Sequence, residues 1–198
     1  MIVEIGIGLA ALGILAKLAG RRTGSKAVTS SAQVTGSQVI IHNRVMRAGN
    51  ISYTLTDDDL LWLARAIYGE AGTHREGGIA VAWALAQNHL LIGSNPPRMG
   101  TFAALTRAYC QPINPVWQDV NSRQCQRNPS ACAPERIQHR RNLSGMAWNS
   151  IPESVRNIVT SFATGALPNP IPGLTEWSAN RYATARQNIG GNWFGTRA

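Results

Sequence analysis

Residues 56–72 read TDDDLLWLARAIYGEAG, and this stretch predicts the helix around which a domain is built. Thr56 suits the N-cap, three aspartates follow in the first turn where the helix dipole favours anions, and Gly72 suits the stop. Apolar residues recur at helical spacing and form one stripe: Leu60, Leu63, Ala64, Ile67, Tyr68 and Ala71. The stripe predicts that one face of this helix packs against a core.

Glu70 lies at the edge of that stripe. At about 100° per residue it projects roughly 20° from Leu63, so we expect it to be partly buried. One interpretation is a structural ion pair with Arg65, His74 or Arg75. The other is a proton donor, because desolvation raises the pKa of a carboxyl group. Raising a glutamate pKa from about 4.3 to about 6 costs on the order of 2.3 kcal/mol, which a fold can tolerate at one site.

Helical patterns continue after Gly72. EGGIAVAWALAQNHLL (76–91) alternates large residues with alanine, and because alanine is the best helix former we expect a buried helix with close neighbours. TFAALTRAY (101–109) and IPESVRNIVTSFATGAL (151–167) are amphipathic. Pro152 and Glu153 suit the first turn of the latter and Gly165 suits its stop. The fold class expected is mainly α, with an α+β character.

Two regions lack regular periodicity. Residues 111–150 are polar and rich in Arg, and predict an irregular insert with one helix around 134–146. LPNPIPGLTEWSANRYA (167–183) has too much proline for a helix, so we expect an extended loop with a short strand at its end.

The N-terminal part divides the chain into three regions. Residues 1–22 predict a hydrophobic membrane or assembly helix, since the run 2–20 approaches the roughly 20 residues that span a bilayer. An ordinary buried helix is the alternative, and the charge order does not suit a secretory signal. Residues 23–54 are rich in Ser, Thr and Gly and predict a linker in which QVIIHNRVM (38–46) allows one short strand. Residues 55–198 predict the catalytic-sized domain.

The net charge of +9, from 19 Lys and Arg against 10 Asp and Glu, suits an anionic partner. Nucleic acid, phospholipid and an acidic cell-wall polymer all fit. The sequence lacks zinc-finger spacing, a Gly-rich phosphate loop and basic residues interleaved with aromatics. We therefore expect no specific nucleic-acid partner.

Three cysteines, Cys110, Cys125 and Cys132, lie in one middle stretch. Cys125 and Cys132 could close a short disulfide loop in an oxidising compartment and leave Cys110 free, or all three could be buried thiols. A zinc site is disfavoured because no CxxC pair is present and His139 lacks a fourth partner. We expect no metal and no cofactor.

LARAIYGEAGTHREGGIAVAWALAQNHL (63–90) resembles the opening motif of the cell wall hydrolase family typified by spore-cortex lytic enzymes. TFAALTRAYCQPINPVW (101–117) and GALPNPIPGLTEWSA (165–179) resemble later segments of that family in the same order. The resemblance implies a lysozyme-like fold and cleavage of peptidoglycan glycan strands between N-acetylmuramic acid and N-acetylglucosamine. The family's catalytic glutamate corresponds to Glu70, which would act first as general acid and then as base.

The stretch GTHRE departs from the family pattern, which has a second carboxylate after the catalytic one. That carboxylate is absent here or displaced to Glu76. The usual glycosidase pair is not required if the acetamido group of the substrate assists. The departure favours a lytic transglycosylase over a water-using muramidase.

Sugars bind through aromatic stacking and hydrogen bonds from amides and hydroxyls. Two segments that match the family's later motifs carry such side chains, and the predicted substrate-binding residues are Gln111, Asn114, Trp117, Thr175, Trp177, Asn180 and Tyr182. Glu176 is the best alternative acid, although its Pro-rich loop predicts an exposed surface position.

The sequence as a whole predicts a peptidoglycan-degrading enzyme for phage entry or cell-wall lysis. It would be virion- or membrane-associated, act in the periplasm or at the cell wall, and use residues 2–20 to contact a membrane or other virion proteins. A bacterial membrane-anchored hydrolase is the next choice. The rivals are a catalytically inactive structural virion or membrane protein with a lysozyme-like core, and a peptidoglycan endopeptidase, for which the sequence offers no metal or nucleophile constellation.

Overall fold

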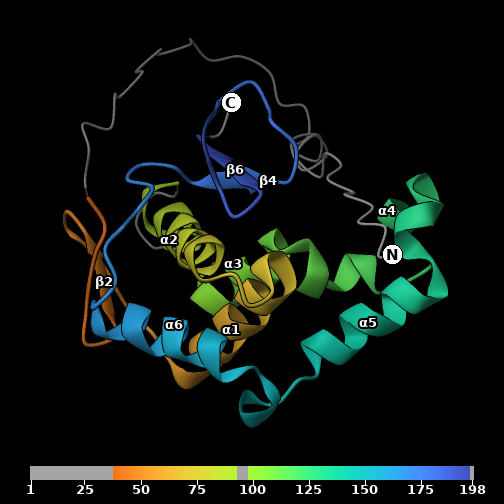
Figure 1. Ribbon diagram of the computed structural model, residues 1–198, viewed down its shortest axis with the longest axis horizontal. Coiled ribbons are helices and arrows are strands. Elements are labelled where there is room, and N and C mark those ends of the chain that lie inside the picture. The colour runs from red at the N-terminus through yellow and green to blue at the C-terminus, as the bar shows by residue number, and fades with distance from the viewer. Residues whose placement is uncertain (1–37, 93–97, 197–198) are drawn as a thin grey trace, which may run out of the picture.

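The computed structural model describes residues 38–92 and 98–196, which form a mixed architecture of helices and two small antiparallel sheets (Figure 1). The six α-helices of this part are α1 (Asp57–Ala71), α2 (Arg75–Leu91), α3 (Phe102–Tyr109), α4 (Arg123–Arg127), α5 (Pro134–Ser144) and α6 (Glu153–Thr164). Short 3-10 helices are η2 (Gln111–Ile113), η3 (Pro115–Trp117), η4 (Pro129–Cys132) and η5 (Trp148–Ser150). The strands are β1 (Ile40–His42), β2 (Val45–Ala48), β3 (Ile51–Thr54), β4 (Glu176–Ser178), β5 (Ala185–Ile189) and β6 (Asn192–Gly195). The α+β character expected from the sequence is confirmed.

Helix α1 begins and ends where the sequence predicts. Thr56 and Asp59 form a reciprocal capping box, in which each side chain accepts from the backbone N–H of the other. Gly72 closes the helix with a positive φ of 58°. Leu63 and Ile67 of the apolar stripe are fully buried. The helix therefore presents its predicted face to the core.

Helix α2 runs through the centre of the molecule, and all its residues from 77 to 90 are buried. The predicted buried helix is confirmed. A Cβ on Gly78 would lie 2.8 Å from Ile67 Cγ2 of α1 and 3.1 Å from Ile158 Cδ1 of α6. Small residues on α2 thus allow α1 and α6 to approach it closely.

Helix α6 also has its predicted bounds, with Glu153 in the first turn and Gly165 closing it at a φ of 80°. A side chain on Gly165 would collide with the carbonyl oxygen of Ile41 in β1. The end of α6 therefore packs directly against the first sheet, beside which it lies in Figure 1.

The first sheet has the order β1-β2-β3, where the sequence allowed only one short strand. Asn43 and Arg44, both with positive φ, form a two-residue hairpin turn between β1 and β2. Alternate residues point inward, and Ile41 and Met46 join the main hydrophobic core. Residues 40–54 are thus not a linker but part of the folded body.

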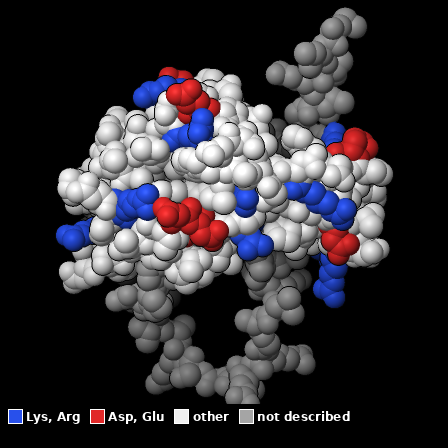
Figure 2. All heavy atoms as spheres, turned by 90° about the horizontal axis from the view of Figure 1, so that it is seen from below, with Lys and Arg blue, Asp and Glu red and all other residues white. Residues whose placement is uncertain are grey.

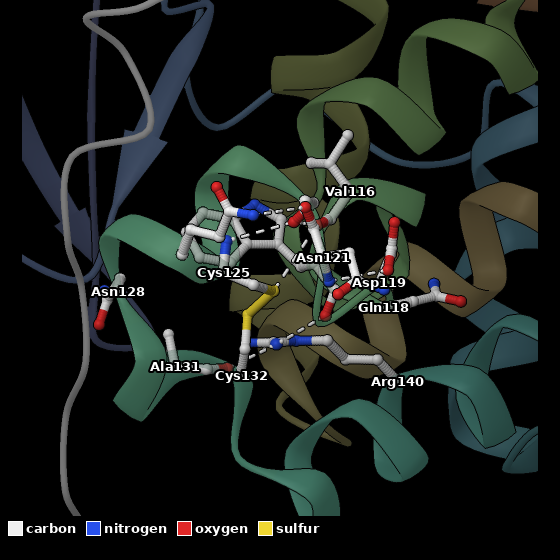
Figure 3. The surroundings of a disulfide bond; sticks show 12 residues. Val116, Gln118, Asp119, Asn121, Cys125, Asn128, Ala131, Cys132 and Arg140 are labelled. Carbon is white, nitrogen blue, oxygen red and sulfur yellow. Dashed lines mark hydrogen bonds between the residues drawn. A yellow bond between two sulfur atoms is a disulfide. The ribbon is translucent and has the colours of Figure 1, made fainter.

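The insert between α3 and α6 contains the predicted helix as α5. Cys125 and Cys132 form a disulfide, and Cys110 is a buried free thiol. Arg140 of α5 runs beneath the disulfide and donates from Nη1 to the carbonyl oxygens of Trp117 (3.0 Å) and Ala131 (2.7 Å) (Figure 3). The disulfide and this buried arginine give the insert its own small core.

The predicted N-terminal helix, residues 1–22, lies outside the described residues. Within the described ranges, no helix has the length and apolar character to cross a membrane. On the face shown in Figure 2, basic side chains form a discontinuous band with acidic ones interspersed.

Candidate functional site

Glu70 lies in the last turn of α1 and is half-buried. Burial raises the pKa of its carboxyl group from 4.5 to about 7, because the surrounding protein removes water from the charged form. Hydrogen bonds from the Trp177 side chain and the Gln111 backbone lower the pKa, but only in part. The negative end of the helix dipole also disfavours an anion here. Glu70 can therefore hold a proton near neutral pH.

The candidate ion-pair partners of Glu70 are Arg65, His74 and Arg75, and none of them forms a salt bridge with it. Arg65 donates from Nε to the carbonyl oxygen of Met146 at 2.9 Å. His74 accepts from Gly77 N–H as the N-cap of α2 and lies 3.8 Å from Glu76. Across residues 38–92 and 98–196, Glu70 has no ion pair within 4.0 Å. A structural ion pair does not account for its position.

Gln111 is held beside Glu70 by the close approach of η2 to α1. A Cβ on Gly69 would lie 2.6 Å from Pro112 Cβ and 2.7 Å from Leu143 Cδ2 of α5. Real Cβ atoms do not come so close, so a glycine is required at this point. The glycine before Glu70 thus brings the N–H of Gln111 within reach of the carboxylate.

Trp177 is positioned by two polar side chains of the buried helix α2. Gln87 donates from Nε2 to the carbonyl oxygens of Ile171 (3.0 Å) and Leu174 (2.8 Å). Asn88 donates from Nδ2 to the carbonyl oxygen of Thr175 at 3.1 Å. These bonds fix the Pro-rich loop as it enters β4, where Trp177 is the second residue. The sequence carries a signal for this arrangement, because two adjacent amide side chains, Gln87 and Asn88, interrupt an otherwise apolar run.

The second sheet, of order β4-β6-β5, packs against α2 and reaches the end of α1 through hydrogen bonds to Glu70. Asn192 of β6 donates from Nδ2 to the carbonyl oxygen of Glu70 at 3.4 Å. Gly190, with a φ of 59°, packs so close to His74 that a Cβ would lie 2.7 Å from Nδ1. The periodicity of residues 184–196 does not predict this hairpin, although the Gly190-Gly191 pair between residues of strand type is a turn signal.

The predicted substrate-binding residues fall into two groups, and the first comprises Gln111 of η2 and the four residues in and around β4. Gln111 and Trp177 contact Glu70. Tyr182 is half-buried and donates from its hydroxyl group to the carbonyl oxygen of Glu176 at 2.9 Å. Thr175 is buried next to Trp177, and Asn180 is exposed in the loop that follows β4. The structure brings Gln111 and Trp177 to the acid, with the other three along the same segment.

Asn114 and Trp117 have structural positions in the insert. Asn114 donates from Nδ2 to the carbonyl oxygen of Ala108 at 2.7 Å, and its Oδ1 accepts from Val116 N–H as the cap of η3. Trp117 is buried in the small core around the disulfide. Neither side chain is presented to a substrate in this arrangement.

Glu176 is buried and only 4% exposed, which corrects the expectation of a surface position. Its Oε1 lies 3.4 Å from Asn88 Nδ2. Successive residues of a strand point to opposite faces, so Glu176 faces α2 while Trp177 faces Glu70.

Glu76, the displaced second carboxylate suggested by the sequence, is exposed in the first turn of α2. No neighbouring charge is among the causes that shift the pKa of Glu70.

A cavity of about 380 Å³ lies beside the acid. Its lining residues come from α1, η2 and α5, and are Gly69, Gln111, Pro112, Glu135, Arg136, His139 and Arg140. Gly69 precedes Glu70, and Gln111 is the residue whose backbone bonds its carboxylate. The described residues contain no group of three or more His, Cys, Asp or Glu side chains that could hold a metal ion.

Cys110 is buried between α3 and η2. Burial and the nearby Glu70 carboxylate raise the pKa of its thiol well above the usual range, so the thiol stays protonated. A protonated buried thiol is a poor nucleophile.

Comparison with known proteins gives no match: no protein-family model, no curated protein sequence and no solved structure matches the chain.

Proposed function

We propose that the protein cleaves peptidoglycan glycan strands, with Glu70 as the proton donor. The observation that carries this proposal is a solitary, desolvated carboxyl group whose pKa is raised to about 7. A general acid works best when its pKa lies near the working pH. The resemblance of residues 63–90 to cell wall hydrolases supports the same residue and a lysozyme-like fold.

The chemistry needs only one carboxyl group. Glu70 gives its proton to the glycosidic oxygen as the bond from C1 of N-acetylmuramic acid breaks. The resulting carboxylate takes the proton of the muramoyl 6-hydroxyl group, and that oxygen bonds to C1. The product is a 1,6-anhydro sugar, and Glu70 is protonated again. The isolation of Glu70 from other charges favours this route over one that uses a second carboxylate to activate water.

The neighbours of Glu70 suit both protonation states. Trp177 and the Gln111 backbone donate to the carboxylate once its proton has left, so the base form is stabilised within the same site. Trp177 also offers an aromatic surface for a sugar ring. Asn180 and Tyr182 follow along the same segment and extend the proposed binding surface, whereas the predicted contact Thr175 is buried beneath it.

The net charge of +9 suits an anionic wall, with electrostatic attraction that salt would weaken. Residues 2–20 would attach the enzyme to a membrane or to other virion proteins. The setting we propose is a virion-associated or membrane-anchored enzyme that acts in the periplasm or at the cell wall. The disulfide between Cys125 and Cys132 suits an oxidising location.

Digestion of purified peptidoglycan, followed by mass spectrometry, tests the proposal. We expect soluble fragments that end in anhydro-muramic acid, and a loss of at least about 100-fold in rate for Glu70→Gln. Glu76→Gln is the matched control, because Glu76 is an exposed acid six residues away, and it should keep the activity.

Three outcomes would contradict the proposal. Cleavage that survives Glu70→Gln would remove Glu70 from the mechanism. Intact glycan with cut peptides would indicate an endopeptidase. A folded wild-type protein that releases nothing from peptidoglycan of several cell-wall types would favour the structural virion or membrane protein.

A further inference from the structure

The cavity beside Glu70 has a wall that glycan cleavage does not use. Four of its lining residues, Glu135, Arg136, His139 and Arg140, come from α5. Its volume of about 380 Å³ lies at the lower end of the range for small-ligand pockets. Two arginines against one glutamate make this wall positively charged.

The two arginines have different roles in the wall. Arg140 is buried, and its guanidinium is fixed by the carbonyl oxygens of Trp117 and Ala131. Arg136 is half-buried and has neither an ion pair nor a side-chain hydrogen bond within the part of the chain that the structure describes. Its donors are therefore available to a ligand, while Arg140 adds positive charge behind it.

We propose that this cavity binds a carboxylate of the peptide that substitutes the muramoyl sugar, with Arg136 as the main contact. The inference rests on the proposed function. A guanidinium group offers paired N–H donors whose geometry matches a carboxylate. Glu135 supplies an acceptor for peptide N–H groups in the same cavity.

The position of the cavity fits that ligand. Two residues that border the cavity are neighbours of Glu70. Gly69 precedes it in the sequence, and the backbone of Gln111 donates a hydrogen bond to its carboxyl group. The peptide leaves the same muramoyl unit whose glycosidic bond Glu70 would protonate. We therefore expect a peptide carboxylate to reach the α5 wall when the sugar lies at Trp177 and Glu70.

The first test compares cleavage of peptide-bearing glycan with cleavage of glycan from which an amidase has removed the peptides. We expect the ratio of the two rates to fall about tenfold in Arg136→Gln, because a charged hydrogen-bonded contact is lost. The ratio for Arg136→Lys should lie between those of the wild type and Arg136→Gln, because lysine keeps the charge but lacks the paired donors. Arg127→Gln, an exposed arginine of α4 outside the cavity, is the matched control and should leave the ratio unchanged.

An unchanged rate ratio in Arg136→Gln would overturn the inference, whether or not both rates had dropped. If the wild-type protein cleaves neither substrate, that result counts against the proposed function instead. The two failures are thus distinguishable.

The second test measures binding and does not depend on turnover. Calorimetric titration with soluble N-acetylmuramoyl peptide should show a Kd about tenfold weaker for Arg136→Gln than for the wild-type protein. The same peptide with its carboxylates converted to amides should bind the wild-type protein as weakly, while inorganic phosphate alone should not compete. Equal affinity for the free and amidated peptides would overturn the inference, and competition by phosphate would show a general anion site.

Discussion

The two ends of α1 each hold a carboxylate in contact with the protein interior, and they differ in what surrounds it. Asp59, in the first turn, is only 1% exposed and accepts from Tyr53 Oη, Thr56 N, Thr56 Oγ1 and Ala103 N at 2.7 to 2.9 Å. Glu70, in the last turn, has two hydrogen-bonding neighbours and a pKa raised to about 7. The two carboxylates therefore differ in how many hydrogen bonds the protein provides to them.

The helix itself contributes to that difference. Its N-terminal end presents unpaired N–H groups and a positive partial charge, so an anion there is stabilised. Its C-terminal end presents carbonyl oxygens and a negative partial charge, so an anion there is disfavoured. We propose from this comparison that Asp59 stabilises the fold and that Glu70 transfers a proton, and each of the following variants tests one side of that proposal.

The largest effect is expected at Asp59. Asp59→Ala leaves the donors of Tyr53, Thr56 and Ala103 without their acceptor, and should lower the free energy of unfolding by about 3 kcal/mol. Asp58→Ala, which changes an exposed acid in the same turn, should cost less than about 1 kcal/mol. Urea unfolding measures both. Equal losses, or a loss of activity per folded molecule in Asp59→Ala, would contradict the structural role.

Gly69→Ala tests the packing that serves Glu70. The added Cβ must displace Pro112 or Leu143, and overpacking of this kind costs about 2 kcal/mol. Because η2 carries Gln111 to the carboxylate, we also expect a lower rate of glycan cleavage. Gly145→Ala is the control, since a Cβ there would meet only backbone oxygen atoms at 3.4 Å or more. A Gly69→Ala variant with unchanged cleavage would show that the contact with η2 is not needed.

Glu70→Gln should change how stability depends on pH. The folded-state pKa of about 7 lies above the unfolded value of 4.5, so the folded wild type binds the proton more tightly, and its stability falls as pH rises through that window. The glutamine variant lacks this fall. Relative to the wild type, its free energy of unfolding should rise by about 2 kcal/mol between pH 4.5 and pH 8. This value is smaller than the full pKa shift would give, because the side chain is partly exposed to water.

Urea unfolding of wild type and Glu70→Gln at both pH values measures that gain. A constant difference between the two proteins across the window would mean that folding does not raise the pKa of Glu70.

The smallest effect is expected at Trp177. Trp177→Phe keeps an aromatic ring but removes the hydrogen bond that lowers the pKa of Glu70. The pKa should rise further, by up to about one unit, and the fall in activity at alkaline pH should move to higher pH by the same amount. Trp193→Phe, on the neighbouring strand β6, is the control. A shift of that fall in activity to lower pH in Trp177→Phe would contradict the assigned hydrogen bond.

Sequence patterns predicted the helices well, because their signals are local. Thr56 and Gly72 mark α1, Gly165 marks the end of α6, and the alanines of α2 identify a helix with close neighbours. The sheets were predicted poorly, because their strands are short and depend on partners. Residues 23–54 predict a linker with one short strand, whereas β1, β2 and β3 lie there, and the sequence patterns do not predict β5 and β6.

The site divides in the same way. The position of Glu70 on α1 could be predicted from helical periodicity alone. The burial of Glu176 could not, since it depends on Gln87 and Asn88, which fix the Pro-rich loop from another helix. The packing of Trp117 into the disulfide core likewise depends on contacts that are distant in sequence.

Titration of the Glu70 carboxyl group is the most direct test of the central claim, that Glu70 holds a proton near neutral pH. Carbon-13 NMR of protein labelled at glutamate side chains, with Glu70→Gln to assign the resonance, follows this group alone. We predict a midpoint at a pKa of about 7. A midpoint near 4.5, the ordinary value for glutamate, would contradict the account of Glu70 as a general acid.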